Sequence, residues 1–228
     1  MRLRAFTVFL FAFTLAAAPV NPDLLQRLDN AAAHFQSMTA TVIYLTHTEV
    51  IDENSTETGI VLMKKVAPGE VQGLINFTAP NQRSVTFEKR GVQIYYPKIK
   101  TLQIYDLEDH GEQLDKFLMI GFGYSGSELA KDYTMTVLGT EAVKGTPEVQ
   151  AIHLELIPKS GEAREYVKKL ELWIPDHGDP YPRREKITEP SGNSRTMTYS
   201  ELKINPQLQP EALKPKLPPG VKTEHPGK

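Results

Sequence analysis

The chain has 228 residues, a formal net charge of −2 and no cysteine. Without cysteine, disulfide bonds and thiol catalysis are excluded, and a slightly acidic charge argues against a nucleic-acid or anionic-membrane partner. The length allows one large β domain or two small ones, and no linker divides the sequence, so we expect a single domain.

Residues 1–18 have the pattern of a secretory signal peptide. Arg2 and Arg4 precede an apolar run from Phe6 to Leu15, and three alanines ending at Ala18 supply a small-residue cleavage site. The run is shorter than the ~20 residues of a membrane anchor. We therefore expect cleavage after Ala18 and export from the cytoplasm. Losing the two arginines leaves 24 basic and 28 acidic side chains, a net charge of −4. No cysteine follows to accept a lipid anchor, so we expect the mature chain to be soluble. We also expect it to be a monomer.

The first predicted helix covers residues 23–35. Asn21 suits the N-cap and Pro22 the first helical position. Apolar residues then recur at helical spacing up to Phe35. A core-packing helix and a lid over a cavity have the same pattern.

From Thr39 to Asn205 the chain alternates between apolar and polar residues in eleven short segments. The predicted strands are 39–50, 57–66, 71–77, 83–89, 92–97, 101–106, 133–140, 149–158, 167–175, 182–190 and 194–204. Short turns separate them, which favours antiparallel neighbours. The gap at 107–132 has helical patterns at 112–122 and at Ser127–Lys131. The single domain is thus expected to span 19–205, followed by a proline-rich extended tail, 206–228, that docks along a sheet edge if at all.

Alternation divides the strands into an apolar and a polar side. Ala40, Val42 and Tyr44 share a side of the first strand, whereas Lys64 and Glu88 represent the opposite, solvated side. About eight strands already enclose a packed interior, so a wider curled sheet forms a container or cradle. We expect the helices 23–35 and 112–122 to cover its apolar face.

No motif in the chain supports catalysis or metal binding. Residues 121–126 spell G-x-G-x-x-G, but no strand precedes them and no long helix follows, so we interpret them as a loop. Ser125 lacks the second glycine of a nucleophile elbow. The six histidines show no pair at zinc-enzyme spacing. We therefore expect no cofactor, no metal and no enzymatic activity.

Lys65 ends a predicted strand on its apolar side. A buried, unpaired ammonium is costly, so Lys65 must reach water at the rim or find oxygen partners. Both interpretations remain open on the residues alone.

The chain resembles the family of periplasmic carriers of outer-membrane lipoproteins, the LolA/LolB fold. The likeness covers the first helix with residues 35–40, then 59–65, 76–77, 91–97, 199–202 and 218–221. It implies a mainly β fold, an incomplete eleven-stranded antiparallel β-barrel whose apolar concave face is covered by lid helices. Since the receptor members of that family are lipid-anchored and this chain lacks the cysteine, it is more similar to the soluble LolA-type carrier.

The resemblance implies a function without catalysis: shielding the acyl chains of lipoproteins between the inner and outer membranes. Its partners would be an acylated lipoprotein, an inner-membrane ABC transporter and an outer-membrane receptor. Lys65 falls where family carriers place a lid-latching arginine, so it is the candidate latch. The predicted lipid-binding residues are Val42, Tyr44, Val61, Met63, Ile75, Phe77, Val85, Phe87, Ile94, Tyr96, Leu118 and Ile120.

Two alternatives remain open. The same cradle could carry another lipid or glycolipid, or serve as a periplasmic sensor domain. A hydrolase acting on a lipid would need a nucleophile and a base, and no such pair stands out, so it ranks below the others.

Overall fold

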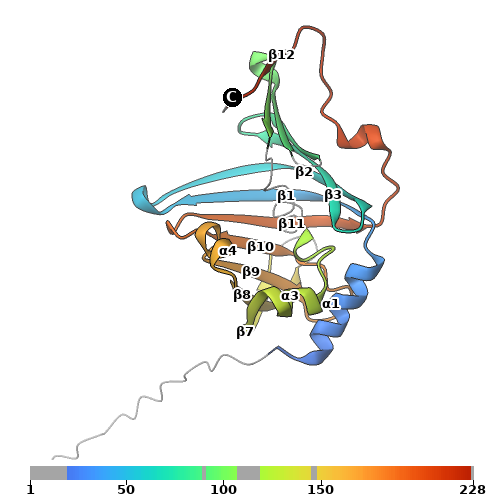
Figure 1. Ribbon diagram of the computed structural model, residues 1–228, viewed down its shortest axis with the longest axis vertical. Coiled ribbons are helices and arrows are strands. Elements are labelled where there is room, and N and C mark those ends of the chain that lie inside the picture. The colour runs from blue at the N-terminus through green and yellow to red at the C-terminus, as the bar shows by residue number, and fades with distance from the viewer. Residues whose placement is uncertain (1–19, 89–90, 107–118, 145–147, 227–228) are drawn as a thin grey trace, which may run out of the picture.

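A single twisted sheet dominates the computed structural model, which describes residues 20–88, 91–106, 119–144 and 148–226. Figure 1 shows the strands turning through a large angle from the middle of the sheet toward β12, with helices beside the other half. Within the described residues the sheet has 12 strands in the order β12-β6-β5-β4-β3-β2-β1-β11-β10-β9-β8-β7. Because β12 and β7 remain as free ends, the sheet is an open half-barrel.

The strands form two antiparallel meanders that meet where β1 pairs with β11. The first comprises β1 (Ser37–Thr48), β2 (Glu53–Ala67), β3 (Glu70–Ala79), β4 (Arg83–Glu88), β5 (Gly91–Tyr96) and β6 (Thr101–Asp106). The second comprises β7 (Tyr133–Val143), β8 (Val149–Pro158), β9 (Lys169–Pro175), β10 (Arg184–Thr188) and β11 (Ser194–Ile204). The short strand β12 (Lys222–Glu224) adds to β6 in parallel.

One residue ties the start of β1 to the end of β11. The Asn205 side chain, just after β11, accepts hydrogen bonds from the Gln36 and Ser37 amides at 2.8 and 3.2 Å and donates to the His34 carbonyl at 2.9 Å. Its φ of 57° lies in the left-handed region, which asparagine tolerates. The link fixes the end of the first helix against β11.

Three α-helices pack beside the sheet in the described part of the chain. α1 (Pro22–His34) begins at the N-cap Asn21, whose side chain accepts from the Asp23 amide. α3 (Gly126–Asp132) begins with a capping box formed by Ser125 and Glu128. α4 (Gly161–Tyr166) links β8 to β9.

The fold expected from the sequence is confirmed, with a few corrections. All eleven predicted strands are present within a few residues, and β12 makes a short twelfth from the predicted tail. α4 was expected to be a turn, but Ser160 caps it by accepting from the Ala163 amide. Most of the helix predicted at 112–122 lies outside the described residues, and its last residues form a turn.

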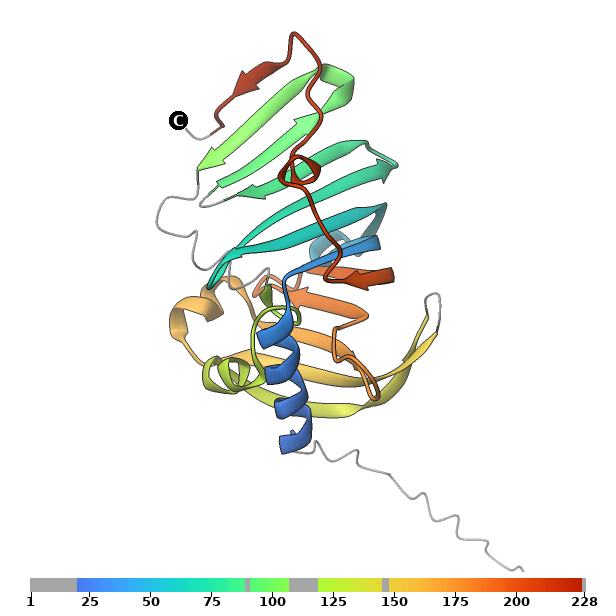
Figure 2. The ribbon, with the colours of Figure 1, turned by 90° about the vertical axis from the view of Figure 1, so that its right-hand side faces the viewer.

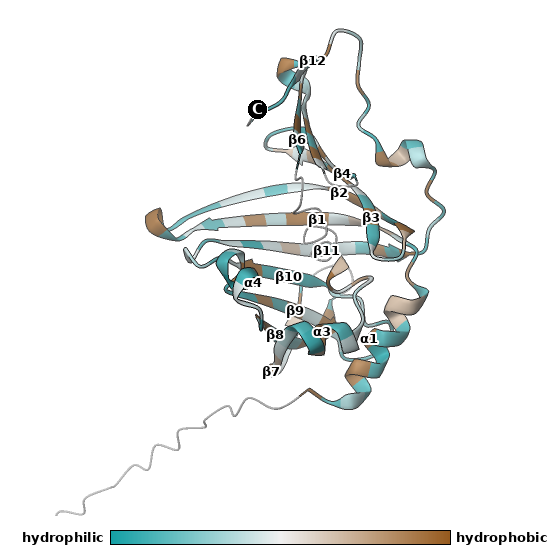
Figure 3. Ribbon diagram, viewed as in Figure 1, coloured by the Kyte–Doolittle hydropathy of each residue, from teal (hydrophilic) through white to brown (hydrophobic). Residues whose placement is uncertain are grey.

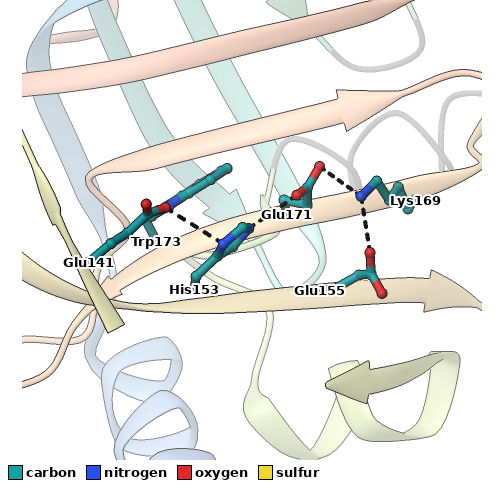
Figure 4. Close-up of polar contacts among 6 residues, drawn as sticks. All are labelled: Glu141, His153, Glu155, Lys169, Glu171 and Trp173. Carbon is teal, nitrogen blue, oxygen red and sulfur yellow. Dashed lines mark hydrogen bonds and ion pairs between the residues drawn. The ribbon is translucent and has the colours of Figure 1, made fainter. Parts of the chain in front are cut away.

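The outer face of β7–β9 carries a row of polar, charged and aromatic side chains (Figure 4). His153 bonds to Glu171 at 3.1 Å and stacks on Trp173 at 4.2 Å between ring centroids. Lys169 lies 3.0 Å from Glu155 and 3.3 Å from Glu171. Such cross-strand pairs stabilise adjacent strands modestly and make the outer face of β7–β9 more polar than its inner face.

The outer face of the first meander is not the solvated surface that the alternation predicted. Leu74, Thr86 and Tyr95 all point there and are at most 5% exposed. The tail covers part of this face: Lys64 donates to the Leu208 carbonyl at 3.0 Å, and Leu213 is fully buried. Figure 2 shows the tail passing the strands on its way to β12. The prediction missed this cover because proline content suggested weak structure.

We predict that Leu213→Ala lowers the free energy of unfolding by about 2–5 kcal/mol, because it leaves a cavity at a fully buried site. Denaturant unfolding of the purified chain measures it. Leu217→Ala is the matched control, since Leu217 in the same tail is 45% exposed. Equal, small effects of the two substitutions would show that the tail does not pack on the sheet.

Candidate functional site

The inner face of the first meander is a continuous apolar surface. Strand pairing aligns Val42 with Gly59, Ile75 with Val85, and Val85 with Ile94. Nine of the twelve predicted lipid-binding residues belong to one cluster with Phe35, Met38 and Ala40: Val42, Tyr44, Val61, Met63, Ile75, Phe77, Val85, Phe87 and Ile94. Figure 3 shows the alternation of apolar and polar residues along β1 and β11.

The other three predicted residues lie elsewhere. Tyr96 is on the same side of β5 as Ile94 but outside that cluster. Ile120 is 3% exposed and packs in a second cluster with Leu24 and Leu28 of α1. Leu118 lies outside the described residues.

The sequence analysis missed the inner face of the second meander. Its strands contribute a second set of buried side chains: Leu154, Leu156, Leu170, Leu172 and Ile174. The alternation in β8 and β9 was a usable signal, because these residues recur every second position. The apolar inner face therefore extends across both halves of the sheet.

The loop at residues 119–124 closes over this face. The Met119 carbonyl accepts from the amides of Phe122, Gly123 and Tyr124 at 2.8–3.0 Å. Phe122 inserts between rings, 5.9 Å from Phe35, 6.1 Å from Tyr181 and 5.5 Å from Tyr199. We call residues 119–124 the plug loop.

The plug loop is held by α1 and by the segment that precedes β10. A Cβ on Gly126 would lie 2.6 Å from the Leu25 carbonyl oxygen, and Ser127 bonds to Asp29 through its amide and hydroxyl at 2.8 and 2.7 Å. A Cβ on Gly121 would lie 2.5 Å from Pro182 Cγ. Close backbone approach thus sets the position of Phe122.

Lys65 lies where the alternation placed it, at the end of β2 opposite Val71. Its amide donates to the Gln36 carbonyl at 2.8 Å, next to the end of α1. Its side chain is half-buried. The latch remains a prediction.

A charged pair that sequence reasoning missed lies near the other end of the inner face. Arg83 forms a two-pronged contact with Glu57, with Nη2 donating to Oε2 at 2.7 Å. Its guanidinium lies 4.1 Å over the Phe77 ring. Hydrogen bonding to Glu57 raises the pKa of Arg83. Because the pair is neutralised internally, it leaves no free charge on the apolar face.

An isolated carboxyl group also lies on the inner face, under the plug loop. Glu185 in β10 pairs with Leu172 and Met197, and its Oε2 accepts from the Tyr199 hydroxyl at 3.1 Å. Glu185 keeps some exposure as a residue, but its Oε1 is shielded from solvent and has no hydrogen-bond partner in the described part of the chain. Burial raises the pKa of Glu185 to about 8, although the Tyr199 hydrogen bond lowers it.

Two cavities open elsewhere on the described surface. One of about 350 Å³ lies between β3–β5 and tail residues such as Ala212. Another of about 310 Å³ lies between α1 and the turn before β10. In the described residues no group of three or more His, Cys, Asp or Glu is placed to hold a metal ion, and no described helix is long and apolar enough to cross a membrane.

Comparison with solved structures supports the fold. An uncharacterized conserved protein from Thermus thermophilus matches with a TM-score of 0.50 at 12% identity, covering 89% of this chain and 97% of that one. MucB matches with a TM-score of 0.50 at 16% identity, covering 85% of this chain and 62% of MucB. The chain therefore spans less than two thirds of MucB.

A LolA superfamily protein from Nitrosomonas europaea also matches, with a TM-score of 0.40 at 13% identity, covering 85% of this chain and 96% of that one. The chain shares its fold with the Thermus protein and MucB. Its open sheet with helices beside it is the half-barrel that the resemblance to the LolA/LolB fold implied. No family model and no curated protein matches the sequence, and identities this low show the fold alone.

We predict that Gly121→Ala loosens the plug loop. Gly121 has a φ of 82°, and an added Cβ would lie 2.5 Å from Pro182 Cγ and 2.9 Å from Glu185 Oε1. Hydrogen–deuterium exchange should accelerate at the amides of Phe122 to Tyr124. Gly161→Ala is the control, because a Cβ there meets nothing within 4 Å. Unchanged exchange in Gly121→Ala would contradict the close contact.

We predict that Glu185 makes stability fall with rising pH. Its folded-state pKa of about 8 lies above the ordinary 4.5, so the pH-dependent part of its burial cost is zero below pH 4.5 and grows up to about pH 8. Glu185→Gln removes this cost, and its stability gain over the wild-type chain should grow to a few kcal/mol by pH 8. Denaturant unfolding from pH 4.5 to 9 tests it. A pH-independent difference between the two proteins would contradict a buried, neutral carboxyl.

Proposed function

We propose that this protein is a periplasmic carrier that shields the acyl chains of lipoproteins. The observation that carries the proposal is the apolar inner face of an open half-barrel, covered by the plug loop instead of by another sheet. A ligand chain can occupy that face when Phe122 withdraws, without unfolding any strand. The LolA-like fold is consistent with such a role.

The energetics suit transfer between membranes. Burying an acyl chain contributes about 0.8 kcal/mol per methylene, so a lipidated protein leaves a bilayer only if an equally apolar surface receives it. The plug loop offsets part of this gain, because Phe122 must give up its ring contacts with Phe35, Tyr181 and Tyr199. The competition keeps binding reversible, which delivery requires.

Methionines make the inner face adaptable. Met38 and Met63 belong to the apolar cluster, Met119 starts the plug loop and Met197 packs beside it. Unbranched thioether side chains fill irregular spaces at low cost. A face with this composition suits chains that differ in length and saturation.

The cellular setting in this proposal rests on the sequence. A cleaved signal peptide over residues 1–18 would deliver the protein to the periplasm. The transfer partners would be an inner-membrane ABC transporter that loads the carrier and an outer-membrane receptor that unloads it. The protein would act without catalysis or a cofactor.

We predict that Ile75→Glu and Phe77→Glu abolish uptake of an acylated lipoprotein peptide, because each places a charge on the apolar inner face. Binding of a fluorescent diacylated peptide to the purified protein measures uptake. Ile43→Glu is the matched control: Ile43 points to the outer side of β1 and is 47% exposed. If the Ile75 and Phe77 variants bind like the Ile43 variant, the inner face is not the binding site.

A second candidate function is a sensor that engages another protein. The likeness to MucB favours it, since MucB has been solved in complex with MucA. Such a protein would bind free lipid or a partner without any need for a lipoprotein. Native mass spectrometry of the protein purified from a periplasm separates the two candidates: a co-purified lipoprotein supports the carrier, and a partner protein without lipid supports the sensor.

A further inference from the structure

We propose that Glu185 and Tyr199 form a polar contact point within the apolar inner face, and that Glu185 donates a hydrogen bond to the carbonyl oxygen of an acyl ester or amide of the bound lipid. This inference rests on the proposed function and names the part of the ligand that the site recognises. The contact point is defined by these two residues.

The placement of Glu185 is unusual for a carboxyl group. It is the second residue of the five-residue strand β10, with Leu172 and Met197 as its strand-pairing partners. Its nearest polar partner is the Tyr199 hydroxyl at 3.1 Å, and Tyr199 itself is 5% exposed. A carboxyl in such surroundings destabilises the fold, since an apolar residue would pack there without a desolvation cost. Its presence therefore points to a role other than stability.

Hydrogen-bond accounting leaves one position open. Tyr199 donates to Oε2 of Glu185, while Oε1 is shielded from solvent and has no hydrogen-bond partner among the residues that the structure describes. Burial raises the pKa of Glu185 to about 8, so the group carries a proton at neutral pH. A protonated carboxyl that accepts at one oxygen retains an O–H donor at the other. The ligand group that would pair with this O–H donor is an uncharged hydrogen-bond acceptor.

The open position faces the route by which a ligand would enter. A Cβ on Gly121 would lie 2.9 Å from Glu185 Oε1, so the plug loop lies directly over this oxygen. Phe122, the next residue, contacts Tyr199 at 5.5 Å between ring centroids. When the plug loop withdraws, the donor and the apolar face are therefore uncovered together.

An acyl carbonyl fits this arrangement. In a lipid the ester or amide carbonyl is the neutral acceptor that directly adjoins the hydrocarbon chain. A chain on the apolar inner face would thus place its carbonyl at the contact point. A cationic headgroup would instead require an ionised carboxylate, which the surroundings of Glu185 disfavour.

The test compares two probes that differ only at the carbonyl, 1-palmitoylglycerol (an ester) and 1-O-hexadecylglycerol (the matching ether). Binding of each to the purified full chain is measured at pH 7 by displacement of a fluorescent fatty acid. One hydrogen bond predicts a preference for the ester of about 3–10-fold. Glu185→Leu, which removes the donor, should reduce the ratio to about 1.

Glu185→Gln is the matched control, because its amide can still accept from Tyr199 and donate to a carbonyl. It should retain the ester preference, and circular dichroism shows whether each variant is folded. Equal binding of ester and ether by the wild-type chain overturns this inference while leaving the acyl-carrier function intact. An unchanged preference in Glu185→Leu, or a loss of preference in Glu185→Gln as well, also overturns it. If neither probe binds, the proposed function and this inference both fail.

Discussion

The apolar inner face of an open sheet is the constraint on which the rest of the structure depends. A closed barrel would bury this face by itself, but β7 and β12 remain free at opposite ends of the sheet. Exposed apolar surface of this extent is unfavourable in water, so other parts of the chain must cover it. The position of α1, the path of the plug loop and the packing of Phe122 follow from that requirement.

The outer faces of the two halves of the sheet differ in composition and in what covers them. The second meander places ionic and aromatic side chains there, with His153 between Glu171 and Trp173. The first meander keeps apolar residues on its outer side and covers part of them with the tail through Leu213. The tail also pairs β12 with β6, which shields the backbone groups of an edge strand. The tail thus covers part of the outer face of the first meander, and the plug loop with Phe122 covers the inner face.

The sequence pattern predicted the strands well because, in an antiparallel sheet with one apolar face, apolar residues recur at every second position of each strand. Ala40, Val42 and Tyr44 were assigned to one side of their strand from that period alone, and strand register places them on the inner face. Contacts between distant segments were not predictable in this way. Nothing local marks Leu213 as buried, because its burial depends on how a proline-rich segment crosses strands far away in the sequence.

The polar residues of the inner face illustrate the same limit. Arg83 and Glu185 stand at inward positions of their strands, yet a charged residue at such a position is normally interpreted as a strand end that reaches water. Only the structure shows that Arg83 is neutralised by Glu57, whereas the one hydrogen-bond partner of the Glu185 carboxyl among the described residues is the Tyr199 hydroxyl. The pattern identifies which residues face inward, and three-dimensional contacts decide what each one does.

The central claim is that an acyl chain occupies the inner face of the sheet. The most direct measurement is photo-crosslinking with a fatty acid that carries a diazirine along its chain, followed by peptide mapping by mass spectrometry. The account predicts adducts on inner-face residues such as Val42, Ile75, Val85 and Phe122. Adducts confined to the outer cavity between Tyr95 and Ala212 would contradict it and would place the lipid under the tail.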